Sequence, residues 1–319
     1  MANRCLSYSS PLPLFGLSWS CRSEDVLKLA VSSVASSYPN ELTILRLDQE
    51  RRTLERVAST EFVYPLSKVQ FLPSMDTANP DLIATCSDSL RLFECDPRSG
   101  ELHTRCRLSV PCKPAPLTSL DWCAHSLNII MTAGYDTTVT LWDIYKQEID
   151  IRFVAQEKTV TDCCFSMRDP NIFLTSGAEG SIRCYDRRRM HVANEVYSTD
   201  RPILRAHFRP SDTNSISCIQ NESPDIVFLD LRNSTQPVCA LKGHQGPVNG
   251  FSWGRDMHGS YLVSVAEDHQ ALIWEHREDK YISIMSYTAP EAIASVDWSW
   301  SGCDWIALTF KDCVQVLHV

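Results

Sequence analysis

Asp136-Thr-Thr-Val-Thr-Leu-Trp142-Asp143 and Asp268-His-Gln-Ala-Leu-Ile-Trp274-Glu275 follow one pattern. An Asp opens a polar turn, alternating apolar residues follow, and an aromatic residue precedes an acidic one. Weaker versions of this ending recur along the whole chain, 43 to 49 residues apart. The seven endings are Leu47-Asp48, Phe93-Glu94, Trp142-Asp143, Tyr185-Asp186, Leu229-Asp230, Trp274-Glu275 and Leu317-His318. A repeat of this length indicates an array of similar supersecondary units.

A second ladder of aromatic residues runs in phase with the first. Each aromatic precedes its matching ending by 19 to 22 residues, except in the first unit, where the distance is 28. Short alternating runs between polar turns are typical of half-buried antiparallel strands. We therefore predict an all-β fold, a seven-bladed WD-repeat β-propeller with four strands in each blade. The aromatics of the second ladder are Trp19, Phe71, Trp122, Phe165, Phe208, Trp253 and Trp298.

The length of 319 residues fits one such ring, and no linker-like composition interrupts it. We therefore expect a single propeller domain over residues 1–319. The last unit, Cys313-Val-Gln-Val-Leu-His-Val319, is a third strand with no fourth strand after it. The N-terminal stretch Arg4-Cys-Leu-Ser-Tyr8 is predicted to supply that outer strand, which would close the ring and protect a sheet edge.

Charge and composition exclude several classes of function. The formal net charge of −9 argues against direct binding of nucleic acid. The uncharged stretch from Cys5 to Cys21 is broken by Pro11 and Pro13, so we expect neither a signal peptide nor a membrane partner. The fourteen cysteines lack Cys-x-x-Cys spacing, so we expect reduced thiols, with no metal and no cofactor. These properties predict residence in the cytoplasm and the nucleus.

A buried chain of His, Ser or Thr, Asp and Trp is expected to satisfy the polar groups inside a blade. Blade six has the full set, and blade three has all but the His. In blade four, Gln156 stands where a His is expected, with Glu179 and Tyr185 in the Asp and Trp positions. Reading the blade-six set as a catalytic triad is less well supported, because its spacings recur in other blades. The members are His244, Ser264, Asp268 and Trp274 in blade six, and Thr132, Asp136 and Trp142 in blade three.

Three residues at polar turns are candidates for partner binding. Tyr135 precedes the turn Asp of blade three, at a position where solvent is expected. Glu267 is its equivalent in blade six, and His269 lies on the other side of Asp268. Exposed aromatics are enriched among interface hot spots, although a single exposed aromatic residue is common on any surface.

A cluster of basic residues is a further candidate for partner binding. Arginine forks pair well with phosphate or carboxylate, so the cluster would suit an acidic or phosphorylated segment. The alternative is a solvated loop at the base of blade four. Its members are Arg183, Arg187, Arg188, Arg189 and His191.

Several of these motifs carry a family resemblance. Ala115-Pro-Leu-Thr-Ser-Leu-Asp-Trp122, Asp268-His-Gln-Ala-Leu-Ile-Trp274 and Asp304-Trp-Ile-Ala307 resemble the anthocyanin-regulator, or transparent testa glabra, family of WD-repeat proteins. That family includes an animal branch of DDB1- and cullin-associated, DYRK-kinase-binding scaffolds. The resemblance implies a non-enzymatic, monomeric propeller that assembles a DYRK-type protein kinase or transcription regulators.

The resemblance also implies docking on the DDB1 adaptor of cullin-RING ubiquitin ligases, as a substrate receptor. The family's docking motif is Trp-Asp-x-Arg. Tyr185-Asp186-Arg187-Arg188 and Leu229-Asp230-Leu231-Arg232 keep the Arg but lack the Trp. An enzyme is the third class to consider, but the chain has no Gly-rich phosphate loop, no metal-spaced His pair and no nucleophile elbow.

Overall fold

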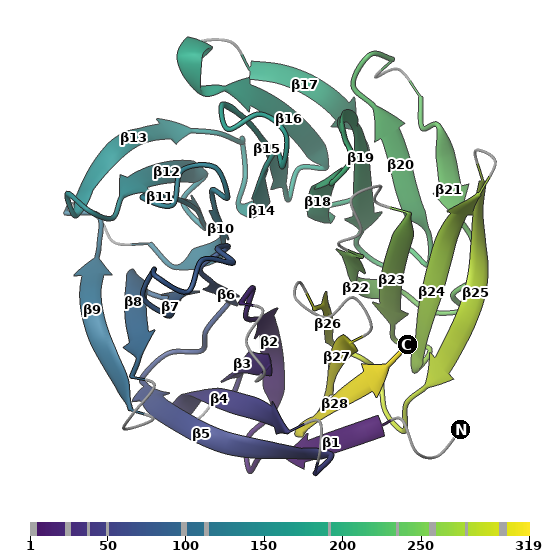
Figure 1. Ribbon diagram of the computed structural model, residues 1–319. Coiled ribbons are helices and arrows are strands. Elements are labelled where there is room, and N and C mark those ends of the chain that lie inside the picture. The colour runs from purple at the N-terminus through teal and green to yellow at the C-terminus, as the bar shows by residue number, and fades with distance from the viewer. Residues whose placement is uncertain are drawn as a thin grey trace.

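The protein is a ring of seven antiparallel sheets of four strands each around a central channel, as the computed structural model shows (Figure 1). The structure describes residues 5–22, 27–36, 39–48, 51–96, 101–111, 115–190, 193–233, 236–254, 260–277, 280–299 and 305–319. In these ranges the single helical element is a 3-10 turn, η1 (Arg187–Arg189). The predicted seven-bladed β-propeller is confirmed.

Each blade takes four strands in chain order from the channel outward, apart from the last, whose outer strand is β1. Blade one has β2 (Leu14–Trp19), β3 (Leu27–Ser33), β4 (Asn40–Asp48) and β5 (Thr53–Phe62); blade two has β6 (Lys68–Phe71), β7 (Leu82–Cys86), β8 (Leu90–Cys95) and β9 (Leu102–Leu108). Blade three has β10 (Leu117–Trp122), β11 (Ile129–Gly134), β12 (Thr138–Asp143) and β13 (Glu148–Val154); blade four has β14 (Val160–Phe165), β15 (Ile172–Gly177), β16 (Ser181–Asp186) and β17 (Ala193–Ser198). Blade five has β18 (Ile203–Arg209), β19 (Asp212–Gln220), β20 (Ile226–Asp230) and β21 (Cys239–Leu241); blade six has β22 (Val248–Trp253), β23 (Tyr261–Ala266), β24 (Gln270–Arg277) and β25 (Lys280–Thr288). Blade seven has β26 (Ser295–Trp298), β27 (Trp305–Phe310), β28 (Cys313–His318) and β1 (Cys5–Ser9).

Both sequence ladders mark strand ends. The aromatics of the second ladder close the innermost strands, except Phe208, which lies one residue before the end of β18. All seven are buried, because each sits in the wedge between two blades. The seven endings close the third strands to within two residues. The sequence pattern, alternating apolar residues followed by turn residues at a fixed spacing, was therefore enough to locate the first and third strands of each blade.

The hydrophobic core consists of seven separate clusters, one at each interface between neighbouring blades. Trp122, for example, packs with residues of blades two and three, and Trp19 packs with residues of blades seven and one. Neither sheet face of a blade is covered unless its neighbour is in place. The burial that stabilises the fold therefore depends on the ring being closed.

Closure is made by β1, which lies beside β28 where the two ends of the chain meet (Figure 1). All five residues of β1 pair antiparallel with β28, from Cys5 opposite Leu317 to Ser9 opposite Cys313. Leu6 and Tyr8 pack on the cluster between blades seven and one, while Ser7 is exposed. The prediction that the N-terminal stretch completes the last blade is confirmed for residues 5–8, while Arg4 lies outside the described residues.

Removal of residues 1–9 is expected to lower the melting temperature of the whole propeller in one cooperative transition. The truncation exposes the edge of β28 and uncovers the cluster shared by blades seven and one. Circular dichroism at the β-sheet minimum measures it. The matched control is Ser7→Asp, which changes an exposed residue of the same strand and should melt as the wild type does. A truncated chain with an unchanged melting temperature would contradict this account.

Candidate functional site

Two tiers of side chains line the channel, which encloses a cavity of about 890 Å³. We call the residue three positions before each inner-strand aromatic the upper tier, and the residue directly before it the lower tier. We call the face on which the turns between second and third strands emerge the turn face. Lys68 pairs with Cys86, the last residue of β7 before its turn, so the upper tier lies nearer the turn face. The upper tier is Gly16, Lys68, Ser119, Asp162, Arg205, Gly250 and Ser295; the lower tier is Ser18, Gln70, Asp121, Cys164, His207, Ser252 and Asp297.

Hydrogen bonds from the lower tier link five pairs of neighbouring blades in the described part of the chain. Asp297 Oδ2 of blade seven accepts the backbone N–H of Trp19 in blade one at 2.9 Å, and Asp121 Oδ2 accepts that of Phe165 at 2.7 Å. Because the side chain comes from one blade and the backbone donor from its neighbour, these bonds fix the spacing of blades around the channel. Three further bonds have the same geometry: Phe71 N–H donates to Ser18 Oγ at 3.0 Å, Trp122 N–H to Gln70 Oε1 at 3.1 Å, and Trp298 N–H to Ser252 Oγ at 3.2 Å.

A second set of hydrogen bonds between blades comes from the residue four positions before an inner-strand aromatic. Here the side chain donates to a backbone carbonyl of the next blade. Examples are Thr161 Oγ1 to Ile203 O and Asn249 Nδ2 to Ile293 O at 2.8 Å. Ser67 and Thr118 make the same contact with Leu117 O and Val160 O. The sequence analysis did not identify either set, although a polar residue before each aromatic is a signal that the ladder already contains.

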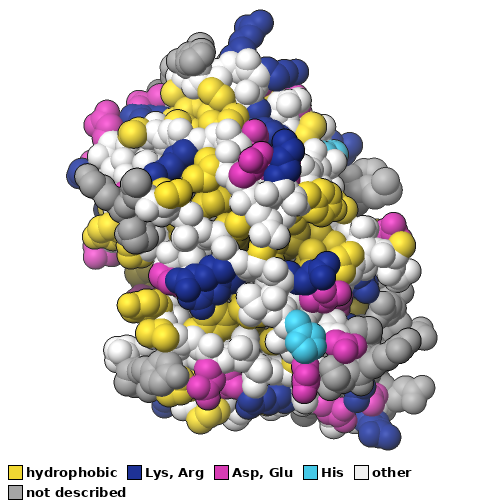
Figure 2. Space-filling view, turned by 90° about the vertical axis from the view of Figure 1, so that its left-hand side faces the viewer, with side chains coloured by type: hydrophobic (Ala, Val, Ile, Leu, Met, Phe, Trp, Pro, Cys, Tyr) yellow, Lys and Arg dark blue, Asp and Glu magenta, His cyan; other side chains and the backbone are white. Residues whose placement is uncertain are grey.

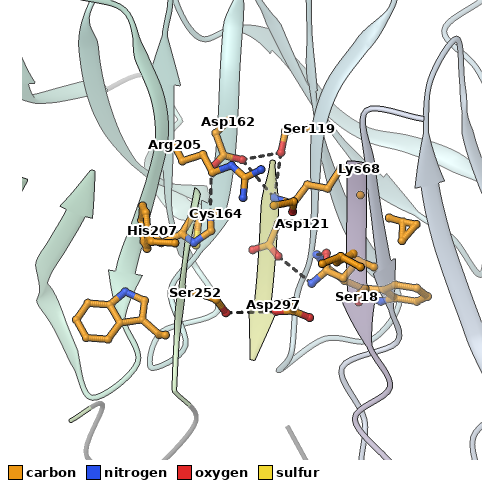
Figure 3. Close-up of a pocket in the computed structure, with 18 of the residues that line it drawn as sticks. Ser18, Lys68, Ser119, Asp121, Asp162, Cys164, Arg205, His207, Ser252 and Asp297 are labelled. Carbon is orange, nitrogen blue, oxygen red and sulfur yellow. Dashed lines mark hydrogen bonds and ion pairs between the residues drawn. The ribbon is translucent and has the colours of Figure 1, made fainter. Parts of the chain in front are cut away.

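A compact ionic cluster centred on Asp162 of the upper tier spans four blades, from Lys68 in blade two to His207 of the lower tier in blade five (Figure 3). Lys68 Nζ lies 3.2 Å from Asp162 Oδ1 and 3.1 Å from Ser119 Oγ, and Ser119 donates to Asp162 at 2.6 Å. His207 Nε2 lies 3.0 Å from the other oxygen of Asp162. Asp162 is thus surrounded by three donors.

The ionisation of this cluster follows from the same contacts. Burial would raise the pKa of Asp162, but Lys68 and the hydrogen bonds to His207 and Ser119 lower it below its usual range. Burial would lower the pKa of Lys68, but Asp162 and Asp121 raise it. In the lower tier, burial raises the pKa of Asp121 despite the nearby Lys68. Asp162 and Lys68 therefore form a charged pair at neutral pH.

The blade-six residues named from the sequence lie in one buried chain. Trp274 Nε1 donates to Ser264 Oγ at 2.8 Å, His244 Nε2 lies 2.7 Å from the same oxygen, and His244 Nδ1 lies 3.1 Å from Asp268 Oδ2. The His244 side chain is 1% exposed. The chain ends on the turn, where Asp268 accepts the backbone N–H groups of Gln245 and Gln270. Its groups are all used inside the blade, which is a structural role.

Blades three and four rearrange the same chain. In blade three, Trp142 Nε1 donates to Thr132 Oγ1 at 2.8 Å, but Asp136 turns to Arg152 of the outer strand, 2.7 Å away. In blade four, the buried Gln156 takes the place of the His. It donates to Thr175 Oγ1 at 2.8 Å and accepts from Ser181 Oγ at 2.7 Å. Glu179 and Tyr185 are also bonded there: Glu179 accepts backbone N–H groups of residues 157 and 158, and Tyr185 donates to Ala155 O.

The turn-face candidates are exposed and lie on two separate blades. Tyr135 is 65% exposed beside the turn of blade three. Glu267 and His269 are exposed at the turn of blade six, and His269 has a positive φ of 66°, which this turn position imposes. Sequence reasoning missed four further apolar residues on this face. They are Val34, Val63, Tyr64 and Val154, of which Val63, Tyr64 and Val154 are 61%, 56% and 69% exposed.

Arg183 lies apart from the other described arginines of the expected basic cluster, so the cluster is not one continuous patch, and partner binding by its members stays a prediction. Arg183 lies in mid-strand, with Glu157 3.4 Å and Glu195 3.8 Å away. Arg187 pairs with Asp150 of blade three at 3.3 Å, whereas Arg189 is exposed. The arginines are dispersed because Arg183 lies within β16, whereas Arg187 follows the end of that strand. His191 lies outside the described residues.

Arg188 and Arg232 have matching environments on the opposite face from the turns. Each follows the end of a third strand and folds back on the Asp two residues before it, at 2.7 Å from Asp186 and 2.6 Å from Asp230. Each is largely exposed, at 61% and 70%. The hydrogen bonds from Arg188 lower the pKa of Asp186 to about 2. The missing Trp of each motif therefore does not disturb the Asp–Arg pair at the surface.

Two negative findings apply to the described ranges. Their cysteines are all free thiols, and no group of three or more His, Cys, Asp and Glu side chains is placed to hold a metal ion. In the same ranges no helix has the length and apolar character needed to cross a membrane.

Comparison with known proteins agrees with this geometry. Residues 104–143 and 235–275 match the family described as WD domain, G-beta repeat. These are the two segments that end on the preserved Trp142 and Trp274. Over its whole length, the chain is similar to the DDB1- and CUL4-associated factor 7 homolog of Dictyostelium discoideum, at 34% identity over 99% of both chains. The chain belongs to this family of WD-repeat proteins.

Two fungal relatives share part of their length with the chain. The WD repeat-containing protein YPL247C of Saccharomyces cerevisiae is 30% identical over 86% of this chain and 58% of its own. The uncharacterized WD repeat-containing protein C17D11.08 of Schizosaccharomyces pombe is 30% identical over 84% of this chain and 68% of its own. None of the three relatives is named as an anthocyanin regulator, so that part of the resemblance gains no support from them.

The blade-six chain predicts a pH dependence of stability. Burial lowers the pKa of His244, so the folded protein resists a proton that the unfolded chain accepts below about pH 6.5. The free energy of unfolding is therefore highest above that pH, and it decreases as the pH falls and His244 must be protonated. His244→Gln should melt with a smaller difference between pH 7.5 and pH 5.5 than the wild type, because Gln does not titrate and Gln156 already fills this position in blade four. Equal differences for both proteins would contradict the assignment.

Proposed function

We propose that this protein is a non-enzymatic scaffold that binds other proteins on its turn face. The observation that carries the proposal is a closed ring, in a family of WD-repeat proteins, whose turn face exposes five apolar side chains between blade one and blade three. These are Val34, Val63, Tyr64, Tyr135 and Val154. Exposed aromatics of this kind are frequent anchors of protein interfaces.

The rim offers a weaker case for binding. Seen from the side of blades two and three, its apolar side chains lie in scattered groups among basic and acidic ones (Figure 2). A mixed surface of this kind is typical of solvated protein. On another part of the rim, the outer strand β25 exposes Ile282, Ile284 and Met285 at 44–50%. Support for the turn face therefore comes from its two exposed tyrosines, Tyr64 and Tyr135, which are more exposed and aromatic.

The partners that we propose are a DYRK-type kinase and transcription regulators. Their mechanism of assembly would be raised effective concentration, because two partners on one rigid disc meet far more often than free ones do. This requires no bond-making step in the propeller. We also propose that the protein works in both the cytoplasm and the nucleus, where such partners act.

Tyr135→Ala should reduce recovery of these partners by about tenfold, the effect of losing one interface anchor worth about 1.4 kcal/mol. Quantitative mass spectrometry of proteins that co-purify with the tagged chain measures it. Tyr145→Ala is the matched control, since Tyr145 is 73% exposed on the opposite side of the same blade. Equal recovery with both variants would exclude Tyr135 as an anchor, and absence of any kinase or transcription regulator would exclude the proposed partners.

The alternative is a substrate receptor that docks on the DDB1 adaptor of a cullin-RING ligase. Two observations favour it: the full-length relative is named for association with DDB1 and CUL4, and Arg188 and Arg232 keep matched Asp–Arg pairs. Combined Arg188→Glu and Arg232→Glu should abolish co-purification of DDB1. Arg189→Glu, an exposed neighbour, is the charge-reversal control and should leave it intact. If the wild type recovers no DDB1, this alternative fails.

A further inference from the structure

Arg205 is a cation in the channel wall for which the described residues supply no hydrogen-bond or ion-pair partner. It comes from β18, and its guanidinium extends into the channel beside the Asp162 cluster (Figure 3). Within the described ranges it makes no hydrogen bond or ion pair, whereas Lys68, the other upper-tier cation, is bonded to Asp162 and Ser119. A guanidinium carries five N–H donors in a fixed fork, and a half-buried fork without acceptors is unusual in a folded protein.

The charges of the upper tier do not balance. Lys68 and Arg205 face a single carboxylate, Asp162, and the oxygens of that carboxylate are already engaged by Lys68, Ser119 and His207. Arg205 is also close enough to Lys68 to oppose its positive charge. The carboxylates Asp121 and Asp297 lie in the lower tier, so the excess positive charge is confined to the upper tier, next to the turn face, where low-dielectric walls strengthen its field.

Space for a ligand lies on the other side of Arg205. The upper-tier positions of blades six, seven and one are Gly250, Ser295 and Gly16, three small and uncharged residues in succession around the wall. A Cβ atom at Gly250 would lie 3.4 Å from Nη1 of Arg205, so the glycine allows the guanidinium to lie against β22. The cavity of about 890 Å³ is ample for a carboxylate or phosphate group with the chain that carries it.

We propose that Arg205 binds a carboxylate or phosphate group that enters the channel from the turn face. Planar, two-pronged pairing with such a group is the interaction for which the arginine fork is best shaped. The source that we favour is an acidic side chain in a partner segment lying across the turn face. That part rests on the proposed scaffold function, while the anion site itself does not.

Arg205→Gln tests the site directly. Two probes are used, a fluorescein-labelled peptide Gly-Ser-Glu-Glu-Glu-Glu-Ser-Gly followed by fluorescence anisotropy, and inorganic phosphate followed by calorimetry. The wild type should bind the acidic peptide, and Arg205→Gln should weaken that binding at least about tenfold, the loss of a charge-assisted pair. Its melting temperature should be unchanged, because Arg205 has no described partner to lose.

Arg201→Gln is the matched control, since it removes the same charge from an exposed position four residues away and outside the channel lining. It should bind as the wild type does. Arg205→Lys keeps the charge without the fork and should show intermediate affinity, which keeps the test decisive if Arg205→Gln folds poorly.

Two patterns of binding support the site and separate its sources. Peptide binding that depends on Arg205 indicates an acidic segment, and phosphate binding alone with the same dependence indicates a free anion. Equal binding by the Arg205→Gln and Arg201→Gln proteins, or no binding of either probe by the wild type, would overturn the proposal. If partners still co-purify with Arg205→Gln but not with Tyr135→Ala, the scaffold function stands without the anion site.

Discussion

The bonds between blades along the channel wall are the interaction on which the rest of the structure depends. Five lower-tier side chains each accept a backbone N–H that belongs to the neighbouring blade. A buried amide left without an acceptor costs about 1–3 kcal/mol, so at these five interfaces each blade is held to its neighbour by groups that neither can satisfy alone. The bond from Trp19 N to Asp297 closes this series at the point where β1 closes the last sheet.

This constraint explains why individual blades tolerate change. Only blades three and six keep the Trp ending, and only blade six joins its His, Ser, Asp and Trp in one chain among the blades described above. Gln156 in blade four and the Asp136–Arg152 pair in blade three satisfy the same turn by other means. The ring persists because the wedge cores and the wall bonds, rather than any single blade network, hold neighbours together.

The amino-acid pattern predicted the fold and the blade-six chain but not the site in the channel. The aromatics and strand endings were readable because their burial imposes a fixed spacing, and the missing last strand pointed to residues 5–8. The sequence did not reveal the side chains that line the channel, because polar residues such as Asp121 and Asp162 alternate with apolar ones, as they do on any solvent-facing strand. Their partners lie one or two repeats away, so that only the closed ring brings Lys68 to Asp162. The expected basic cluster is not one patch for a related reason: proximity in sequence does not place Arg183, within β16, on one surface with Arg187, which follows the end of that strand.

The account treats the seven blades as one cooperative unit, and native-state hydrogen exchange tests this most directly. Mass spectrometry would follow exchange in peptides covering the inner strand of each blade at increasing, sub-denaturing urea. We predict that the backbone N–H groups of Trp19, Phe71, Trp122, Phe165 and Trp298 converge on a single free energy of opening, equal to that of global unfolding. Separate, lower free energies for individual blades would contradict the central role of the bonds between them.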